Sequence, residues 1–272
     1  MRIFLSGLLK LSRRLATWLT FGILLAILGL IFVAVGAAPP PPESGGDPGQ
    51  GGVDPAILLE FPAAYDNVIA FILGLGGLLA VIYGAAIAGS EWTWGTLKSA
   101  VARGENRTLY VLGTFAAIAA VFAIGIVVAT AFGVVAALVG GAIAGIPSDG
   151  IGDSAALGAI PEKLARVWVA IVGEGALGFA IATLTRSQLA GIGVGVGLYF
   201  GGQFAGIFLP DVVQYLPFSA ANAVLAADGT GQGGGQVVQA LEPNIALLVV
   251  AAWLIGALIV AALFTERAEI AG

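Results

Sequence analysis

Long apolar runs alternate along the chain with short polar or Gly- and Pro-rich segments. Each run is about 20 residues or longer, which is the length that an α-helix needs to cross the hydrocarbon core of a bilayer. We therefore predict an all-α, polytopic membrane protein that forms one transmembrane domain over residues 1–272. The six predicted spans are residues 15–38, 65–88, 109–139, 164–184, 190–209 and 244–264.

The first run follows a basic segment, an order that also occurs in secretory signal peptides. Signal-peptide apolar cores are only about 7–15 residues long, so we expect residues 15–38 to be a retained transmembrane helix. The basic segment, residues 1–14, places Lys10 and three arginines among apolar residues. It is either a charged flank of the first span or an amphipathic helix lying along the membrane surface.

Two connecting segments stand out. Residues 39–55, PPPPESGGDPGQGGVDP, have no apolar face and are predicted to be an exposed loop outside the bilayer. The run at 109–139 is longer than one crossing requires. Its continuation is expected either to project beyond the membrane or to break at Gly140 and Gly141.

Composition narrows the possible chemistry. The chain is 59% hydrophobic and 10% charged, whereas soluble domains carry roughly 25% charged residues. Its 42 glycines suit close contact between helices in lipid. The sequence contains no Cys and no His, which excludes disulfides, thiol catalysis and haem ligation, and most zinc sites. It also leaves little acid–base chemistry near neutral pH.

Charge is distributed unevenly along the chain. Cytoplasmic loops of membrane proteins carry an excess of Lys and Arg. With both termini in the cytoplasm, nine of the 11 basic residues fall on that side: Arg2, Lys10, Arg13, Arg14, Lys98, Arg103, Arg107, Arg186 and Arg267. The outer loops keep Lys163, Arg166 and most of the acidic residues. We predict this topology and no nucleic-acid partner, because no other basic face exists.

The longest predicted cytoplasmic loop is residues 89–108. Leu97, Ala100 and Val101 follow helical spacing, which predicts a short helix that a soluble partner could contact. Alternatively, the two tryptophans, Trp92 and Trp94, anchor the chain at the membrane interface, and the charged residues of the loop form a solvated turn.

The stretch EWTWGTLK, residues 91–98, followed by Arg103 and Arg107, closely resembles the first cytoplasmic loop of type 2 ATP-binding-cassette (ABC) permeases. In that family, an acidic residue, a Gly-Thr pair and downstream basic residues mark the helix that couples to the ATPase. The resemblance implies these coupling residues: Glu91, Trp94, Gly95, Thr96, Leu97, Lys98, Arg103 and Arg107. We expect Glu91 to orient the loop, Gly95 to permit a close turn, Thr96 to cap the following helix and Leu97 to fill a groove on the ATPase.

Other segments resemble the same family in the same order. Residues 1–14 are similar to its elbow helix, 184–187 to its turn between spans four and five, and 215–222 to its outer segment before the last span. The resemblance implies that residues 210–243 form an outer re-entrant segment with a short helix capped by Pro217. The ending departs from the family pattern, because it reads Arg-Ala-Glu-Ile instead of a contiguous Arg-Asp pair.

The family resemblance implies an exporter-like permease of a bacterial or archaeal inner membrane. It would pair with a second permease copy and with cytosolic ABC ATPase subunits, surrounded by membrane lipids. The chain lacks the G-x-x-x-x-G-K-[ST] phosphate-binding motif, so we expect no cofactor and no enzyme activity of its own, with ATP and Mg on the partner ATPase. The alternatives are a structural or assembly subunit without transport, and an ion-coupled secondary transporter.

An ionisable residue within a span is a candidate for the substrate pathway, and Glu174 is such a residue. Alternatively, Glu174 is a protonated, hydrogen-bonded group at a helix interface, or it lines a water-filled cleft. Gln203, Tyr215 and Asn222 are further polar candidates toward the outer half of the membrane.

Overall fold

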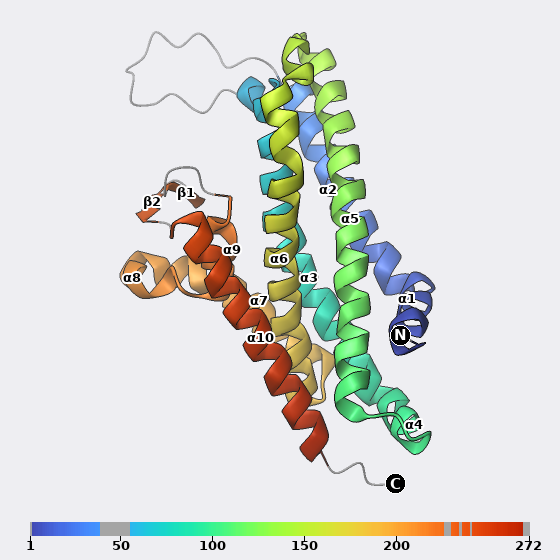
Figure 1. Ribbon diagram of the computed structural model, residues 1–272. Coiled ribbons are helices and arrows are strands. Elements are labelled where there is room, and N and C mark those ends of the chain that lie inside the picture. The colour runs from blue at the N-terminus through green and yellow to red at the C-terminus, as the bar shows by residue number, and fades with distance from the viewer. Residues whose placement is uncertain (1, 39–54, 226–229, 234–235, 240, 269–272) are drawn as a thin grey trace.

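The computed structural model describes residues 2–38, 55–225, 230–233, 236–239 and 241–268 (Figure 1). Six of its helices are long and apolar enough to cross a membrane, which confirms the predicted all-α polytopic fold. These helices are α2 (Leu15–Ala37), α3 (Ala63–Thr93), α5 (Arg107–Ala144), α6 (Ser154–Thr185), α7 (Gln188–Phe208) and α10 (Pro243–Arg267). Apart from Pro55, the predicted loop at 39–55 lies outside the described residues.

Shorter elements lie between and beside the spans. They are α1 (Arg2–Ser12), η1 (Pro55–Leu58), α4 (Thr96–Ala102), η2 (Asp149–Gly152), α8 (Pro210–Val213) and α9 (Pro217–Ala223). Two short strands, β1 (Thr230–Gly233) and β2 (Gln236–Gln239), pair antiparallel with Thr230 opposite Gln239. The composition did not predict this hairpin. Pro217 is the first residue of α9, where a short helix was expected.

The helix α5 is 38 residues long and continues through Gly140 and Gly141. The expected break at these glycines is therefore wrong. Gly140 is used instead for close packing, because a Cβ there would lie 3.1 Å from the carbonyl carbon of Phe32 in α2. The helix ends at Gly145, which adopts a left-handed φ of 73° that favours glycine.

The helices α3 and α6 form the centre of the bundle. Their backbones touch where glycines meet. A Cβ added at Gly178 of α6 would lie 2.9 Å from the carbonyl carbon of Val81 in α3, and one at Gly84 would lie 3.1 Å from that of Gly175. Small residues let helices approach this closely in lipid, where packing contributes much of the association energy.

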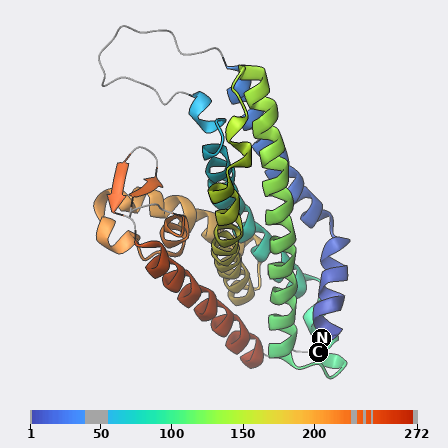
Figure 2. The same ribbon diagram turned by 45° about the horizontal axis from the view of Figure 1, so that its top comes forward.

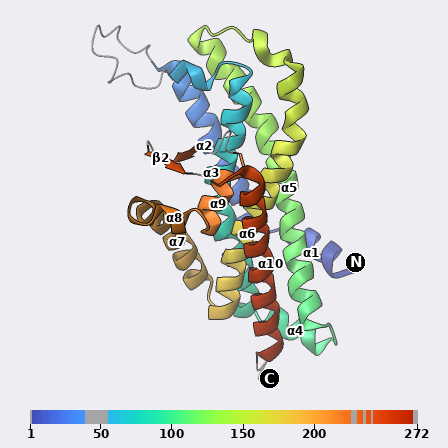
Figure 3. The same cartoon turned by 60° about the vertical axis from the view of Figure 1, so that its left-hand side comes forward.

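The remaining helices surround this pair. The helix α2 packs on α5 and α3, while α10 packs on α6 and α5 (Figure 3). The helices α7, α8 and α9 and the hairpin lie together on one side of the molecule (Figures 1 and 2). The short helix α4 and the end of α10 lie at the same end of the bundle, and α1 lies beside the lower part of α5 (Figure 1).

Candidate functional site

The connection from α3 to α5 is built as a short helix held against the bundle. The helix α3 continues to Thr93, so residues 89–93 of the predicted loop are helical. Gly95 then adopts a left-handed φ of 64°, which a residue with a side chain adopts only at an energetic cost. This turn starts α4, whose inner residues Leu97 and Ala100 are buried.

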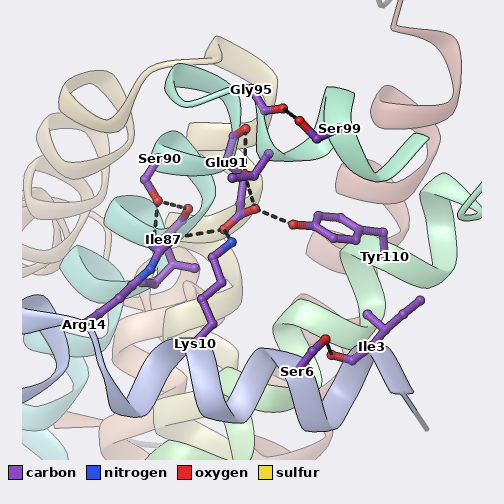
Figure 4. Close-up of polar contacts among 11 residues, drawn as sticks. Ile3, Ser6, Lys10, Arg14, Ile87, Ser90, Glu91, Gly95, Ser99 and Tyr110 are labelled. Atoms are coloured by element: carbon purple, nitrogen blue, oxygen red, sulfur yellow. Dashed lines mark hydrogen bonds and ion pairs between the residues drawn. The ribbon is translucent and has the colours of Figure 1, made fainter. Parts of the chain in front are cut away.

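The carboxylate of Glu91 is buried at the end of α3 and binds four donors from different parts of the chain (Figure 4). Lys10 of α1 lies 2.5 Å from it, and the guanidinium of Arg14, between α1 and α2, lies 3.1 Å from it. The hydroxyl of Tyr110 in α5 donates over 2.5 Å, and the hydroxyl of Thr96 in α4 also donates. We call these five residues the Glu91 centre.

Charge is compensated within the Glu91 centre. Charge-assisted hydrogen bonds of this kind are stronger than neutral ones, and removing one partner of a buried pair leaves an uncompensated charge. Arg14 also donates to the hydroxyl of Ser90 over 2.7 Å, and its guanidinium carbon lies 5.0 Å from the ring centroid of Trp94. The Glu91 centre therefore joins α1, α3, α4 and α5 into one unit.

A second set of contacts ties the neighbouring helix ends together. Arg186, in the turn between α6 and α7, lies 5.0 Å from the ring centroid of Trp92 and 5.6 Å from that of Phe264 in α10. Arg107 donates to the carbonyls of Glu266 and Ala268, over 3.0 Å and 2.9 Å, at the end of α10. A cation at this position is favourable because the last carbonyls of a helix carry partial negative charge.

The structure changes the roles expected for some of the coupling residues. Leu97 is 3% exposed, so the expectation that it fills a groove on a partner is wrong. Leu97 and Ala100, the buried residues of α4, pack against the chain's own helices. Thr96 is not a cap, because Gly95 holds that position and the Thr96 hydroxyl bonds to Glu91. Gly95 does form the expected turn.

The remaining coupling residues lie outside the core. Trp94, Lys98 and Arg103 are exposed on or beside α4, whereas Arg107 is half-buried against α10. Sequence reasoning did not identify Lys10, Arg14, Tyr110 or Arg186 as part of this region. Lys10 and Arg14 are four residues apart in the basic N-terminal segment, and this cluster of cations was the signal available for a shared acidic partner.

The candidates for the substrate pathway are separated. Glu174 is 3% exposed in α6, and one of its carboxylate oxygens, Oε2, has no hydrogen-bond partner among the described residues. Tyr215, which precedes α9, is half exposed, and Asn222 is exposed at the end of α9. Gln203 lies within α7. Glu174 is thus buried within α6, whereas Tyr215 and Asn222 lie in or beside α9 with exposed side chains.

The described part of the chain contains no group of three or more Asp, Glu, His or Cys that could hold a metal ion. Comparison with protein-family models gives no match to the sequence. A search of curated proteins likewise finds no relative.

Proposed function

We propose that this chain is the membrane-spanning permease subunit of an ATP-driven transporter of the ABC type, working in export. The Glu91 centre carries the proposal. It attaches the short helix α4, at the end of the bundle, to the spans α3 and α5 and to the amphipathic helix α1. Such an attachment suits a helix on which a second protein exerts force. The resemblance of residues 91–98 to the coupling loop of type 2 ABC permeases supports the same function.

The helix α4 cannot shift independently of the spans. Its buried face, Leu97 and Ala100, packs against the bundle, and Thr96 is bonded to Glu91 of α3. Displacement of α4 by an ATPase would therefore be transmitted to α3, and through Tyr110 to α5. The surface offered to the ATPase consists of the exposed residues Trp94 and Ala102.

ATP and Mg would bind to cytosolic ATPase subunits, since this sequence has no phosphate-binding motif of its own. A second permease copy would complete the transport pathway in a bacterial or archaeal inner membrane. Large apolar side chains such as Phe204 on α7 and Leu248 on α10 are exposed and suit contact with lipid or with that second copy.

Gentle purification from native membranes tests the proposal. We expect a separate ATPase at one copy per permease. Ala102→Glu on the exposed side of α4 should release it, because a charge placed in a docking surface opposes desolvation. Ser148 is exposed beyond the other end of α5, so Ser148→Glu is the matched control and should retain the ATPase. A stable complex without a nucleotide-binding subunit would favour the assembly-subunit alternative.

Glu174 favours a second candidate, an ion-coupled secondary transporter, because a buried carboxyl with an unpaired oxygen can bind and release a proton. Reconstitution into vesicles with an imposed pH gradient separates the two. Proton uptake without ATP that is abolished by Glu174→Gln would support the second candidate. Transport that needs ATP and survives Glu174→Gln would support the permease.

A further inference from the structure

A pocket lined by both apolar and polar side chains lies between α1, α4 and α5, beside the Glu91 centre. It has a volume of about 240 Å³. Ser6 and Lys10 of α1 line one side, Ser99 and Arg103 line the side formed by α4, and Tyr110 of α5 lines the third. Figure 4 shows Lys10 of α1 and Tyr110 of α5 both directed at Glu91, with Ser6 on α1 below them and Ser99 on α4 above them in this view.

The lining of this pocket favours an anion. Lys10 and Arg103 are cations, and the acidic residue of the pocket, Glu91, is already bonded to Lys10 and Arg14. Glu105, exposed after α4, is the nearest further acid along the chain. The hydroxyls of Ser6 and Ser99 already donate to the carbonyls of Ile3 and Gly95, over 2.9 Å and 3.1 Å, so the charged donors of the pocket are Lys10 and Arg103.

The surroundings of the pocket are suited to lipid chains. Leu5 and Leu9 of α1 are 51% and 63% exposed and lie next to Ser6 and Lys10 in sequence. A helix with an exposed apolar ridge beside cationic residues typically lies in the membrane surface, where phosphates and acyl chains meet. Lys and Arg at this level attract anionic lipid.

We propose that this pocket binds the phosphate of an anionic phospholipid, with the acyl chains lying along Leu5 and Leu9. Its volume of about 240 Å³ is far above the roughly 15 Å³ that a cavity needs to hold one water, so a group much larger than water can enter it. The proposal is independent of ATP-driven transport, because the pocket is formed by this chain alone.

The bound lipid would connect α1 to α4. Lys10 would hold the phosphate from α1, while Arg103 would hold it from the end of α4. The anionic lipid would therefore reinforce the attachment that the Glu91 centre provides between the same two helices.

Native mass spectrometry of the full chain, titrated with phosphatidylglycerol or phosphatidylcholine, tests the proposal. We expect one phosphatidylglycerol to be retained per chain and phosphatidylcholine to be lost. Arg103→Glu should lower the phosphatidylglycerol affinity at least about fivefold, because it replaces a cation of the pocket with a negative charge. Ser99→Trp should have the same effect by filling the pocket without changing charge.

Arg13→Glu is the matched control. Arg13 is exposed at the same end of the molecule but does not line the pocket, so this variant should bind phosphatidylglycerol as the parent does. Equal loss of binding in Arg13→Glu and Arg103→Glu would overturn the proposed pocket site, because it would show that general surface charge retains the lipid. Unchanged binding in Ser99→Trp would also overturn it. Inorganic phosphate binding as tightly as phosphatidylglycerol would show a soluble-anion site and overturn the lipid assignment.

Discussion

A side chain at position 77 would occupy the space that the carboxyl group of Glu174 fills. A Cβ added to Gly77 would lie 2.7 Å from Cδ of Glu174, across the interface between α3 and α6. Both residues are buried. The glycine and the carboxyl are therefore matched in shape, although Oε2 of Glu174 lacks a hydrogen-bond partner among the described residues.

Gly77→Ala should destabilise the protein by about 1–3 kcal/mol, because overpacking forces the side chain of Glu174 or the two helix backbones to shift. Gly74→Ala is the matched control on the same helix, since a Cβ there meets no atom within 4 Å. It should be neutral or stabilise slightly. Unfolding in mixed micelles with increasing denaturing detergent measures both.

The same pair permits a double-mutant test. Glu174→Ala creates space opposite position 77, so the combination of Gly77→Ala and Glu174→Ala should be less destabilised than the sum of the single changes. Strict additivity would show that Gly77 and Glu174 are not matched.

Glu91→Gln should loosen α1 from the bundle. The amide keeps the size of the carboxylate but removes the negative charge shared by Lys10 and Arg14, with an expected loss of about 3 kcal/mol. The chain contains no cysteine, so Leu11→Cys can report on α1. Leu11 is 1% exposed, and its thiol should react with a maleimide much faster when Glu91→Gln is also present.

The control for this experiment is Asp66→Asn. Asp66 forms an ion pair with Lys163, but its side chain is 61% exposed, and exposed pairs contribute about 0–1 kcal/mol. The reactivity of Leu11→Cys should not change in this background. Equal acceleration by Asp66→Asn and Glu91→Gln would contradict a specific role for the Glu91 centre.

Arg107→Ala should fray the last turn of α10. The guanidinium donates to the carbonyls of Glu266 and Ala268, and the loss of a cation from a helix C-terminus costs about 1 kcal/mol. Hydrogen exchange at amides near Arg267 should accelerate several-fold. Lys163→Ala, which removes a cation from α6, should leave this exchange unchanged.

The positive-inside pattern predicts that α4 and the loop between α5 and α6 lie on opposite sides of the membrane. Single cysteines at the exposed positions Ala102 and Ser148 test this in the cysteine-free chain. An impermeant maleimide should label Ser148→Cys in intact cells and Ala102→Cys only after lysis. Labelling of both in intact cells would refute the predicted topology.

Hydropathy predicted the number of spans. It locates the stretch of chain that crosses the hydrocarbon core, and a helix can extend beyond that stretch. The prediction for the fourth span began at residue 164, whereas α6 begins at Ser154, where Asp153 caps the helix by accepting from the amide of Ala156. The stretch between them includes Pro161, Glu162 and Lys163, which lower its hydropathy without ending the helix.

The candidate site was predictable only in part. The acid, the glycine and the threonine of residues 91–96 identified the turn. The partners of Glu91 did not follow from that local pattern, because Lys10 is 81 residues away and its position depends on how α1 packs. The burial of Leu97 was equally hidden, since the spacing of Leu97 and Ala100 indicates an apolar face but not which protein covers it.

The unbroken length of α5 affects how far motion can travel through this molecule. At about 1.5 Å per residue, its 38 residues form a rod of about 57 Å. A tilt of about 5° around the end held by Tyr110 would move the opposite end by roughly 5 Å, without unfolding any turn. A small rotation at one membrane surface would thus become a displacement as wide as a side chain at the other.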